Sequence, residues 1–306
     1  MSKDTIESLG EFGLIEEIKK WLGPIPKAFT GIGDDAAVFC AQPGMNQLLT
    51  IDALVENVDF IRNKAAAEQI GHKALGVNLS DIAAMGGIPK AAVISLILPK
   101  WTEISFVKGF YVGIRSVAKK FGVVVVGGDL SKGPVVCCSI AMIGEAAPKY
   151  TVRRSGAKVG DFICVTGRLG GSILGKHLDF TPRVAEGQFL ARQGVTAMID
   201  ISDGLAQDLT HITSESKVGG VIDERKIPVS NEAVKLANGN KRAALDHALA
   251  DGEDFELLFT IAENRLYSLE KAWRKRFKIP LTQIGKIVAR NNATLEMRKR
   301  LGFQHF

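Results

Sequence analysis

The sequence predicts an α/β or α+β protein of two domains. The chain has 306 residues, which is long for one hydrophobic core and ordinary for two. In both halves, apolar runs typical of strands alternate with stretches that have helical spacing. A boundary falls near residues 147–155, where an apolar run ends at Pro148 and polar residues follow. We therefore predict an N-terminal domain of residues 1–148 and a C-terminal domain of residues 149–306.

The spacing of hydrophobic residues predicts the helices and strands of the N-terminal half. We predict helices over 6–21, 65–79 and 105–121, and strands over 48–55, 91–99, 123–126 and 135–146. Gly23-Pro24 ends the first helix. The segment 80–87 is rich in small residues, which let a backbone or a ligand approach closely. The last two strands are near enough in sequence to pair as a hairpin-like unit.

The C-terminal half repeats this mixture of elements. We predict strands over 160–167 and 283–288, a strand that breaks into a loop within 197–204, and a further strand that follows a loop within 248–261. Helices are expected to begin at residue 170 and to cover 205–216 and 264–276. No internal repeat is evident by residue identity, so each half is an α/β or α+β unit of its own.

Composition excludes several classes of protein. With 46% hydrophobic and 24% charged residues, the chain is typical of globular proteins. Neither a secretion signal nor an apolar stretch of membrane-spanning length occurs, which indicates a cytoplasmic protein without membrane contact. The net charge of +6 is spread along the chain without aromatic platforms, so nucleic-acid binding is not expected. The cysteines form no C-x-x-C pair and are expected to be reduced thiols: Cys40, Cys137, Cys138 and Cys164.

Aspartates beside glycine or serine recur after apolar segments. The motifs are GIGDDAAVF with Asp34 and Asp35, LLTIDALV with Asp52, NLSDIAAMGG with Asp81, VVGGDLSKG with Asp129, and IDISDG with Asp200 and Asp203. Mg²⁺ prefers hard oxygen ligands and bridges carboxylates to substrate phosphates. One such motif is more often a turn or a helix cap. Five together predict a magnesium site around a nucleotide phosphate.

Other catalytic classes lack their signatures. There is no G-x-x-x-x-G-K-[ST] loop, no H-R-D with D-F-G pair and no G-x-S-x-G elbow. The five histidines are far apart and lack metal-ligand spacing, so we expect no histidine in a metal site.

The motifs, taken in order, resemble those of the thiamine-monophosphate kinase family. Besides the aspartate segments, the likeness includes D-x-L-V-E, RRSGAKVGD and DGEDFELLFT, and it extends from about Gly10 to Phe306. The resemblance implies an aminoimidazole ribonucleotide synthetase-like fold, in which an N-terminal domain with a mixed sheet dimerises and a C-terminal α/β domain completes the site. It also implies ATP-dependent phosphorylation of thiamine monophosphate to thiamine diphosphate in a cytoplasmic homodimer, with the nucleotide between the domains.

The resemblance also implies roles for individual residues. Mg²⁺ ligands would be Asp35, Thr50, Asp52, Asp81, Asp129, Asp200 and Asp203. ATP contacts would be Tyr111, Gly128, Asp129, Arg154 and Ser202. The catalytic set would be Asp81, Asp129, Arg154 and Asp203, and the substrate pocket would contain Asp59, Glu253 and Phe303. Packing alone is an alternative for Tyr111, Glu253 and Phe303. No strong general base is needed, because the acceptor is an already ionised phosphate oxygen.

Two positions depart from the family pattern. Asp59 stands where the family usually has a substrate-contacting histidine, and its carboxylate would repel a phosphate but attract the cationic thiazolium. Ile51 replaces a commonly polar residue beside Thr50. Both changes leave the aspartate set intact.

Two other functions stay open as alternatives. One is another enzyme of the same superfamily. Selenophosphate synthetase would need a reactive residue before Cys40, and none is found there. A hydrogenase maturation factor would need a C-terminal cysteine, whereas this chain reads LGFQHF. The other is a non-catalytic nucleotide-binding regulator. Unused clustered carboxylates would destabilise such a protein by mutual repulsion.

Overall fold

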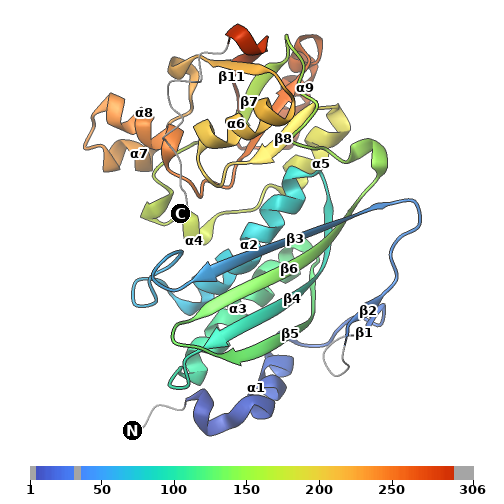
Figure 1. Cartoon of the computed structure of the whole chain (residues 1–306), viewed down its shortest axis with the longest axis vertical. Coiled ribbons are helices and arrows are strands. Elements are labelled where there is room, and N and C mark those ends of the chain that lie inside the picture. Colours follow the sequence, from blue (N-terminus) through green and yellow to red (C-terminus); the bar gives the residue numbers. More distant parts are fainter. Residues whose placement is uncertain (1–4, 31–35, 293–306) are drawn as a thin grey trace. The chain divides into compact units, whose positions relative to one another are not determined.

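A computed structural model describes residues 5–30 and 36–292 of the chain (Figure 1). Contacts divide it into two compact units. The first comprises Met1–Ile82 and Ile88–Pro148, and the second comprises Ala83–Gly87 and Lys149–Phe306. The short segment Ala83–Gly87 therefore packs with the second unit, although it lies among first-unit residues in the sequence.

The first unit is a mixed sheet covered by helices. Its elements are α1 (Ile6–Leu22), β1 (Phe29–Thr30), β2 (Val38–Phe39), β3 (Asn46–Val55), α2 (Ala67–Ala84), β4 (Ile88–Leu98), α3 (Ile104–Phe121), β5 (Val124–Lys132) and β6 (Cys137–Ala146). Strands β1 and β2 form a separate small ladder, and the main sheet has the order β3-β6-β4-β5. Only the β4–β5 pair of this sheet is parallel. The predicted mixed sheet is confirmed.

Two glycines bring the helices of this unit close together. A Cβ at Gly71 of α2 would overlap the carbonyl oxygen of Phe110, and one at Gly113 of α3 would overlap that of Glu68. Figure 1 shows α2 and α3 together behind the sheet. Their apolar sides and the facing strand residues form a core in which Leu75, Ile94 and Ile140 are buried.

Three local predictions for this unit are wrong. Strand β6 pairs with β3 and β4 instead of β5, so 123–146 is no hairpin. Helix α2 continues to Ala84 and does not end at residue 79 as predicted, so Asp81 lies in its last turn and not in the segment that follows the helix. Strand β5 continues through GGD to Lys132, so Asp129 lies inside a strand and not after one.

The second unit is an antiparallel sheet between two helical layers. Its elements are β7 (Phe162–Thr166), α4 (Lys176–Asp179), α5 (Val184–Gln193), β8 (Ala197–Asp200), α6 (Leu205–Glu215), β9 (Gly219–Ile222), α7 (Asn231–Leu236), α8 (Lys241–Ala250), β10 (Leu257–Ile261), α9 (Glu263–Arg276) and β11 (Leu281–Val288). The sheet order is β8-β10-β7-β11-β9.

Side chains alternate between the two faces of this sheet, and each face packs into its own hydrophobic core. Ile163 and Val165 face a cluster that includes Leu209 of α6, whereas Cys164 faces Leu190 of α5 and Trp273 of α9. The predicted helix from residue 170 is wrong. That segment forms a 3₁₀ turn at Ser172–Leu174 and the four-residue α4, because glycines with positive φ interrupt it.

Two further features follow from the described residues. No helix among them is long and apolar enough to cross a bilayer. The four cysteines are free thiols; Cys138 and Cys164 are buried, and burial raises the pKa of each.

Candidate active site

The first unit brings Thr50, Asp52 and Asp81 together. Thr50 and Asp52 are alternate residues of β3 and so project from one face of the sheet. Asp81 reaches the same place from the last turn of α2, where its carboxylate accepts a hydrogen bond from the Thr50 hydroxyl. Asp52 is also hydrogen-bonded to Asp81. Three oxygen-bearing side chains predicted as ligands therefore form one cluster.

The charge of this cluster suits a divalent cation. Burial, the charge of Asp81, the hydrogen bond with Asp81 and the charge of Asp59 together raise the pKa of Asp52 to about 7. Two carboxylates in contact resist joint ionisation, and a bound cation removes that cost. Hard oxygen donors without nitrogen or sulfur are the set that Mg²⁺ prefers. The residues present fit this ion.

Asp59 lies beside the cluster and holds the turn after β3. Its Oδ2 accepts a hydrogen bond from the backbone N–H of Val55 at 2.7 Å. Its carbonyl accepts one from the ammonium of the fully buried Lys73, also at 2.7 Å. The carboxylate is thus engaged by backbone in the described structure, and its predicted contact with substrate stays a prediction.

Asp129 does not join Asp52 and Asp81. The strand registers align Asp129 with Ser95, Ser139 and Ala53, one residue out of step with Asp52. Because residues in register share a face and neighbours alternate, Asp129 projects from the opposite face of the sheet, where Ser131 donates to its Oδ2 at 2.9 Å. Ile51 lies on that opposite face too, so a polar side chain there would not reach the ligands beside Thr50.

Tyr111 and Gly128, both predicted to contact ATP, line one cavity of about 80 Å³. Residues of α1 form its other wall. Tyr111 is buried and packs against Trp21 and Phe110, with ring centroids at 6.4 and 5.5 Å, and burial raises the pKa of its phenol. Packing alone also explains why residue 128 is glycine, since a Cβ there would overlap the Ile94 carbonyl.

The second unit gathers its carboxylates around the loop after β8. Asp200 is buried at the end of that strand, and Ser202 and Asp203 follow in the loop. The backbone N–H groups of Asp203 and Gly204 donate to Oδ2 of Asp208 at 3.2 and 3.1 Å. His211 lies one turn further along α6. One ligand atom each from Asp203, Asp208 and His211 lies within 4.8 Å of the others.

Asp208 and His211 therefore lie beside the predicted ligand Asp203, and the sequence analysis singled out neither of them. The expectation that no histidine lies in a metal site stays a prediction. The motif IDISDGLAQDL contains Asp208, and its signal is helical spacing. Residues 208 and 211 share a side of a helix that begins at Leu205.

Asp208→Asn should make the protein less sensitive to alkaline pH. Burial and the charges of Asp200 and Asp203 raise the pKa of Asp208 from 3.8 to about 8. The folded state therefore favours the protonated acid, and stability is lost as pH rises from 3.8 through about 8. Asn keeps the acceptor for both N–H groups without the charge. In calorimetry with EDTA, its gain in Tm over the wild type should be about 5 °C greater at pH 8.5 than at pH 5. Equal gains at both pH values would contradict this.

The other predicted residues of this unit are placed differently. Arg154 is exposed, and its guanidinium has no hydrogen bond or ion pair with any described residue. Glu253 is half-buried, and its backbone N–H donates to the Ser202 carbonyl at 2.7 Å. Asp34, Asp35 and Phe303 lie outside the described residues.

Comparisons with known proteins agree on the family. The family model for the AIR synthase related protein N-terminal domain matches residues 33–146, and that for the C-terminal domain matches residues 155–298. The thiamine-monophosphate kinase of Rhodopirellula baltica is 38% identical over 276 residues, which cover 87% of this chain and 85% of that protein. This chain belongs to the thiamine-monophosphate kinase family. It is an enzyme of the kinase class, and the resemblance inferred from its motifs is confirmed.

Solved structures of the family agree with the fold. Thiamine-monophosphate kinase from Stenotrophomonas maltophilia has a TM-score of 0.81 and 32% identity, covering 92% of this chain and 95% of that one. The structure of AaThiL complexed with AMPPCP and TMP has a TM-score of 0.76 and 33% identity, covering 98% of both chains. The predicted aminoimidazole ribonucleotide synthetase-like fold is confirmed.

Proposed function

We propose that this protein transfers the γ-phosphate of ATP directly and in line to thiamine monophosphate, giving thiamine diphosphate, with Mg²⁺. One observation carries the proposal: this chain, a member of the family, contains the hydrogen-bonded Thr50–Asp81–Asp52 cluster, whose oxygen atoms suit that ion. The relative crystallised with AMPPCP and TMP supports the same pair of substrates. Because the reaction consumes ATP, we place it in the cytoplasm.

The residues of the chain bind and orient reactants in this proposal. Thr50, Asp52 and Asp81 would hold Mg²⁺, which when bound neutralises the charge of the polyphosphate. Asp129, Asp200, Asp203 and the undescribed Asp35 stay proposed ligands. Arg154 offers a planar guanidinium that is unpaired within residues 5–30 and 36–292 and can bind phosphate oxygens bidentately. No side chain has to remove a proton, because the acceptor oxygen is already ionised at neutral pH.

The deciding experiment is a product assay with purified protein, Mg²⁺-ATP and a panel of acceptors. We expect thiamine diphosphate from thiamine monophosphate, and no comparable product from thiamine or from other phosphomonoesters. ATP binding without turnover on any acceptor would favour the non-catalytic regulator. Turnover on a different acceptor only would favour another enzyme of the superfamily.

We propose further that two copies of the chain pair through the first unit's sheet. The face opposite α2 and α3 presents Leu49 and Ile51, which are 75% and 67% exposed, and Val93, which is 39% exposed. The registers place Ile51, Ala141 and Val93 side by side across three strands. A contiguous apolar face of this kind is costly in water and typical of an interface. A second copy presents the same face, as a two-fold dimer requires.

Ile51→Glu should dissociate this dimer. The two-fold axis places the new charge in the interface twice, so we expect Kd to rise about 30-fold or more. Sedimentation velocity over a range of concentrations measures this. Tyr267→Glu is the matched control, because Tyr267 is an exposed aromatic residue of α9 in the other unit. A dimer constant unchanged by Ile51→Glu would exclude this face.

A further inference from the structure

The loop that carries Ser202 and Asp203 rests on a second segment, Asp251–Glu256. The backbone N–H of Glu253 donates to the Ser202 carbonyl at 2.7 Å, and that of Phe255 donates to the Ile201 carbonyl at 2.8 Å. In return, the N–H of Ile201 donates to the Glu256 carbonyl at 2.8 Å. The position of the loop is therefore set by the path of this segment.

That path is strained. Glu253 has φ 62° and Phe255 has φ 50°, both in the left-handed region that residues other than glycine rarely adopt. Such conformations persist only where the surroundings enforce them. The Phe255 ring is held by Phe180, at a centroid distance of 4.0 Å and an interplanar angle of 21°.

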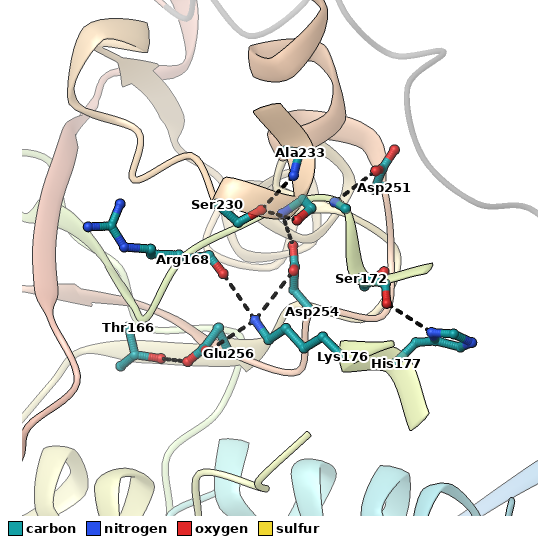
Figure 2. A network of polar contacts seen from close by, with 12 residues as sticks. Thr166, Arg168, Ser172, Lys176, His177, Ser230, Ala233, Asp251, Asp254 and Glu256 are labelled. Atoms are coloured by element: carbon teal, nitrogen blue, oxygen red, sulfur yellow. Dashed lines mark hydrogen bonds and ion pairs between the residues drawn. The ribbon is translucent and has the colours of Figure 1, made fainter. Parts of the chain in front are cut away.

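Two cations hold the acidic side chains of the segment. Arg183 donates from Nε to Oε2 of Glu256 at 2.8 Å and from Nη2 to Oε1 at 2.6 Å. Figure 2 shows the Lys176 ammonium between the carboxylates of Glu256 and Asp254, at 3.2 and 3.4 Å, with the Arg168 carbonyl at 3.0 Å. Each carboxylate is 1% exposed, so the cations replace water that is excluded.

Neutral donors complete the arrangement. Thr166 donates its hydroxyl to Oε2 of Glu256 at 2.8 Å, and the Gly170 N–H donates to Oδ2 of Asp254 at 2.8 Å. Burial raises the pKa of Glu256, but Arg183 and Lys176 reverse the shift and hold it below its usual range. Burial raises the pKa of Asp254 to about 6, although Lys176 opposes the shift. Asp254 therefore depends on Lys176 for its charge.

We infer that Lys176 and Arg183 are positioning residues for phosphoryl transfer, because they fix the strained Asp251–Glu256 segment and through its backbone the Ser202–Asp203 loop. Lys176 acts from α4 and Arg183 from the residue before α5. The inference rests on the proposed function for its kinetic consequence, but its structural part can be tested without turnover.

Hydrogen–deuterium exchange tests the structural part. In Lys176→Met and Arg183→Lys, the amides of Ile201, Glu253 and Phe255 should exchange about 10-fold faster than in the wild type. Amides of β11 serve as the internal reference, because that strand does not contact the segment's backbone. Arg183→Lys retains the charge and loses the two-point fork, so it keeps the protein folded while it loosens the contact. Unchanged exchange at residues 201–203 in both variants would overturn the inference.

Kinetics test the functional part on the same full-length variants. At a temperature where both are folded, kcat should fall about 10- to 100-fold, with a smaller change in KM for thiamine monophosphate. In Lys176→Met, the acidic limb of the kcat profile should also move to higher pH, because Asp254 then faces Glu256 without the ammonium. Lys176→Arg should restore much of kcat, and the exposed-pair variant Arg225→Gln should match the wild type.

The outcomes separate the two claims. A wild type without turnover refutes the proposed function and leaves the exchange result to decide the positioning. An active wild type, with variants that lose Tm but keep kcat and the pH profile, reduces Lys176 and Arg183 to stabilising residues and overturns the inference.

Discussion

Asp81→Asn should lower kcat by about 10³-fold or more while the protein stays folded. Asp81 accepts the Thr50 hydroxyl and shares a hydrogen bond with Asp52, so it is the central carboxylate of the proposed Mg²⁺ site. Asn has nearly the same shape and can still accept from Thr50. It lacks the charge that holds a divalent cation, so the variant should lose Mg²⁺ binding while it stays folded.

The stability of this variant provides an independent check. In the wild type, the charge of Asp81 contributes to a raised pKa of Asp52, which costs stability as pH rises from 3.8 through about 7. Removing that charge should raise the Tm of the metal-free protein at pH 8 and not at pH 4. Asp223→Asn is the matched control, since Asp223 belongs to the other unit and pairs with exposed Arg225. An Asp81→Asn enzyme within 10-fold of wild-type kcat would exclude the metal assignment.

The strands and helices of the first unit could be predicted because strand and helix spacing differ along the first 150 residues, and the family resemblance implied that the strands form a mixed sheet. The order of its strands could not. Strands β5 and β6 are close in the sequence, yet β6 lies between β3 and β4, where its alternate residues Cys138, Ile140 and Met142 are buried. Burial on the helix-covered face decides this pairing, and sequence distance does not.

The candidate site shows the same limit. Thr50 and Asp52 could be placed together because two residues apart in a strand share a face. Asp129 could not be placed, because its face depends on a register shift between β4 and β5. The contacts of Glu256 join residues 73 to 90 positions apart, so only the fold reveals them.

The position of the loop after β8 also depends on Gly252, which the sequence motifs do not indicate. Gly252 belongs to the DGEDFE motif, where its role could be taken for turn flexibility. Its φ lies outside the left-handed region, and a Cβ there would overlap the carbonyl oxygen of Ser202. Its own carbonyl accepts the Ser172 hydroxyl at 2.7 Å. The residue is glycine because two backbones meet at this point.

Gly252→Ala should therefore lower kcat about 10²-fold without removing any chemical group from the site. The added methyl group cannot displace a flexible side chain, since its neighbour is backbone, so Ser202 and Asp203 have to shift. Steady-state kinetics at saturating ATP, with circular dichroism to establish folding, measures the effect. Gly220→Ala is the matched control in the same unit, because its Cβ would meet only side chains at 3.4–3.5 Å. A folded Gly252→Ala enzyme with kcat within 3-fold of the wild type would mean that the loop after β8 tolerates displacement, and that neither Ser202 nor Asp203 is held for catalysis.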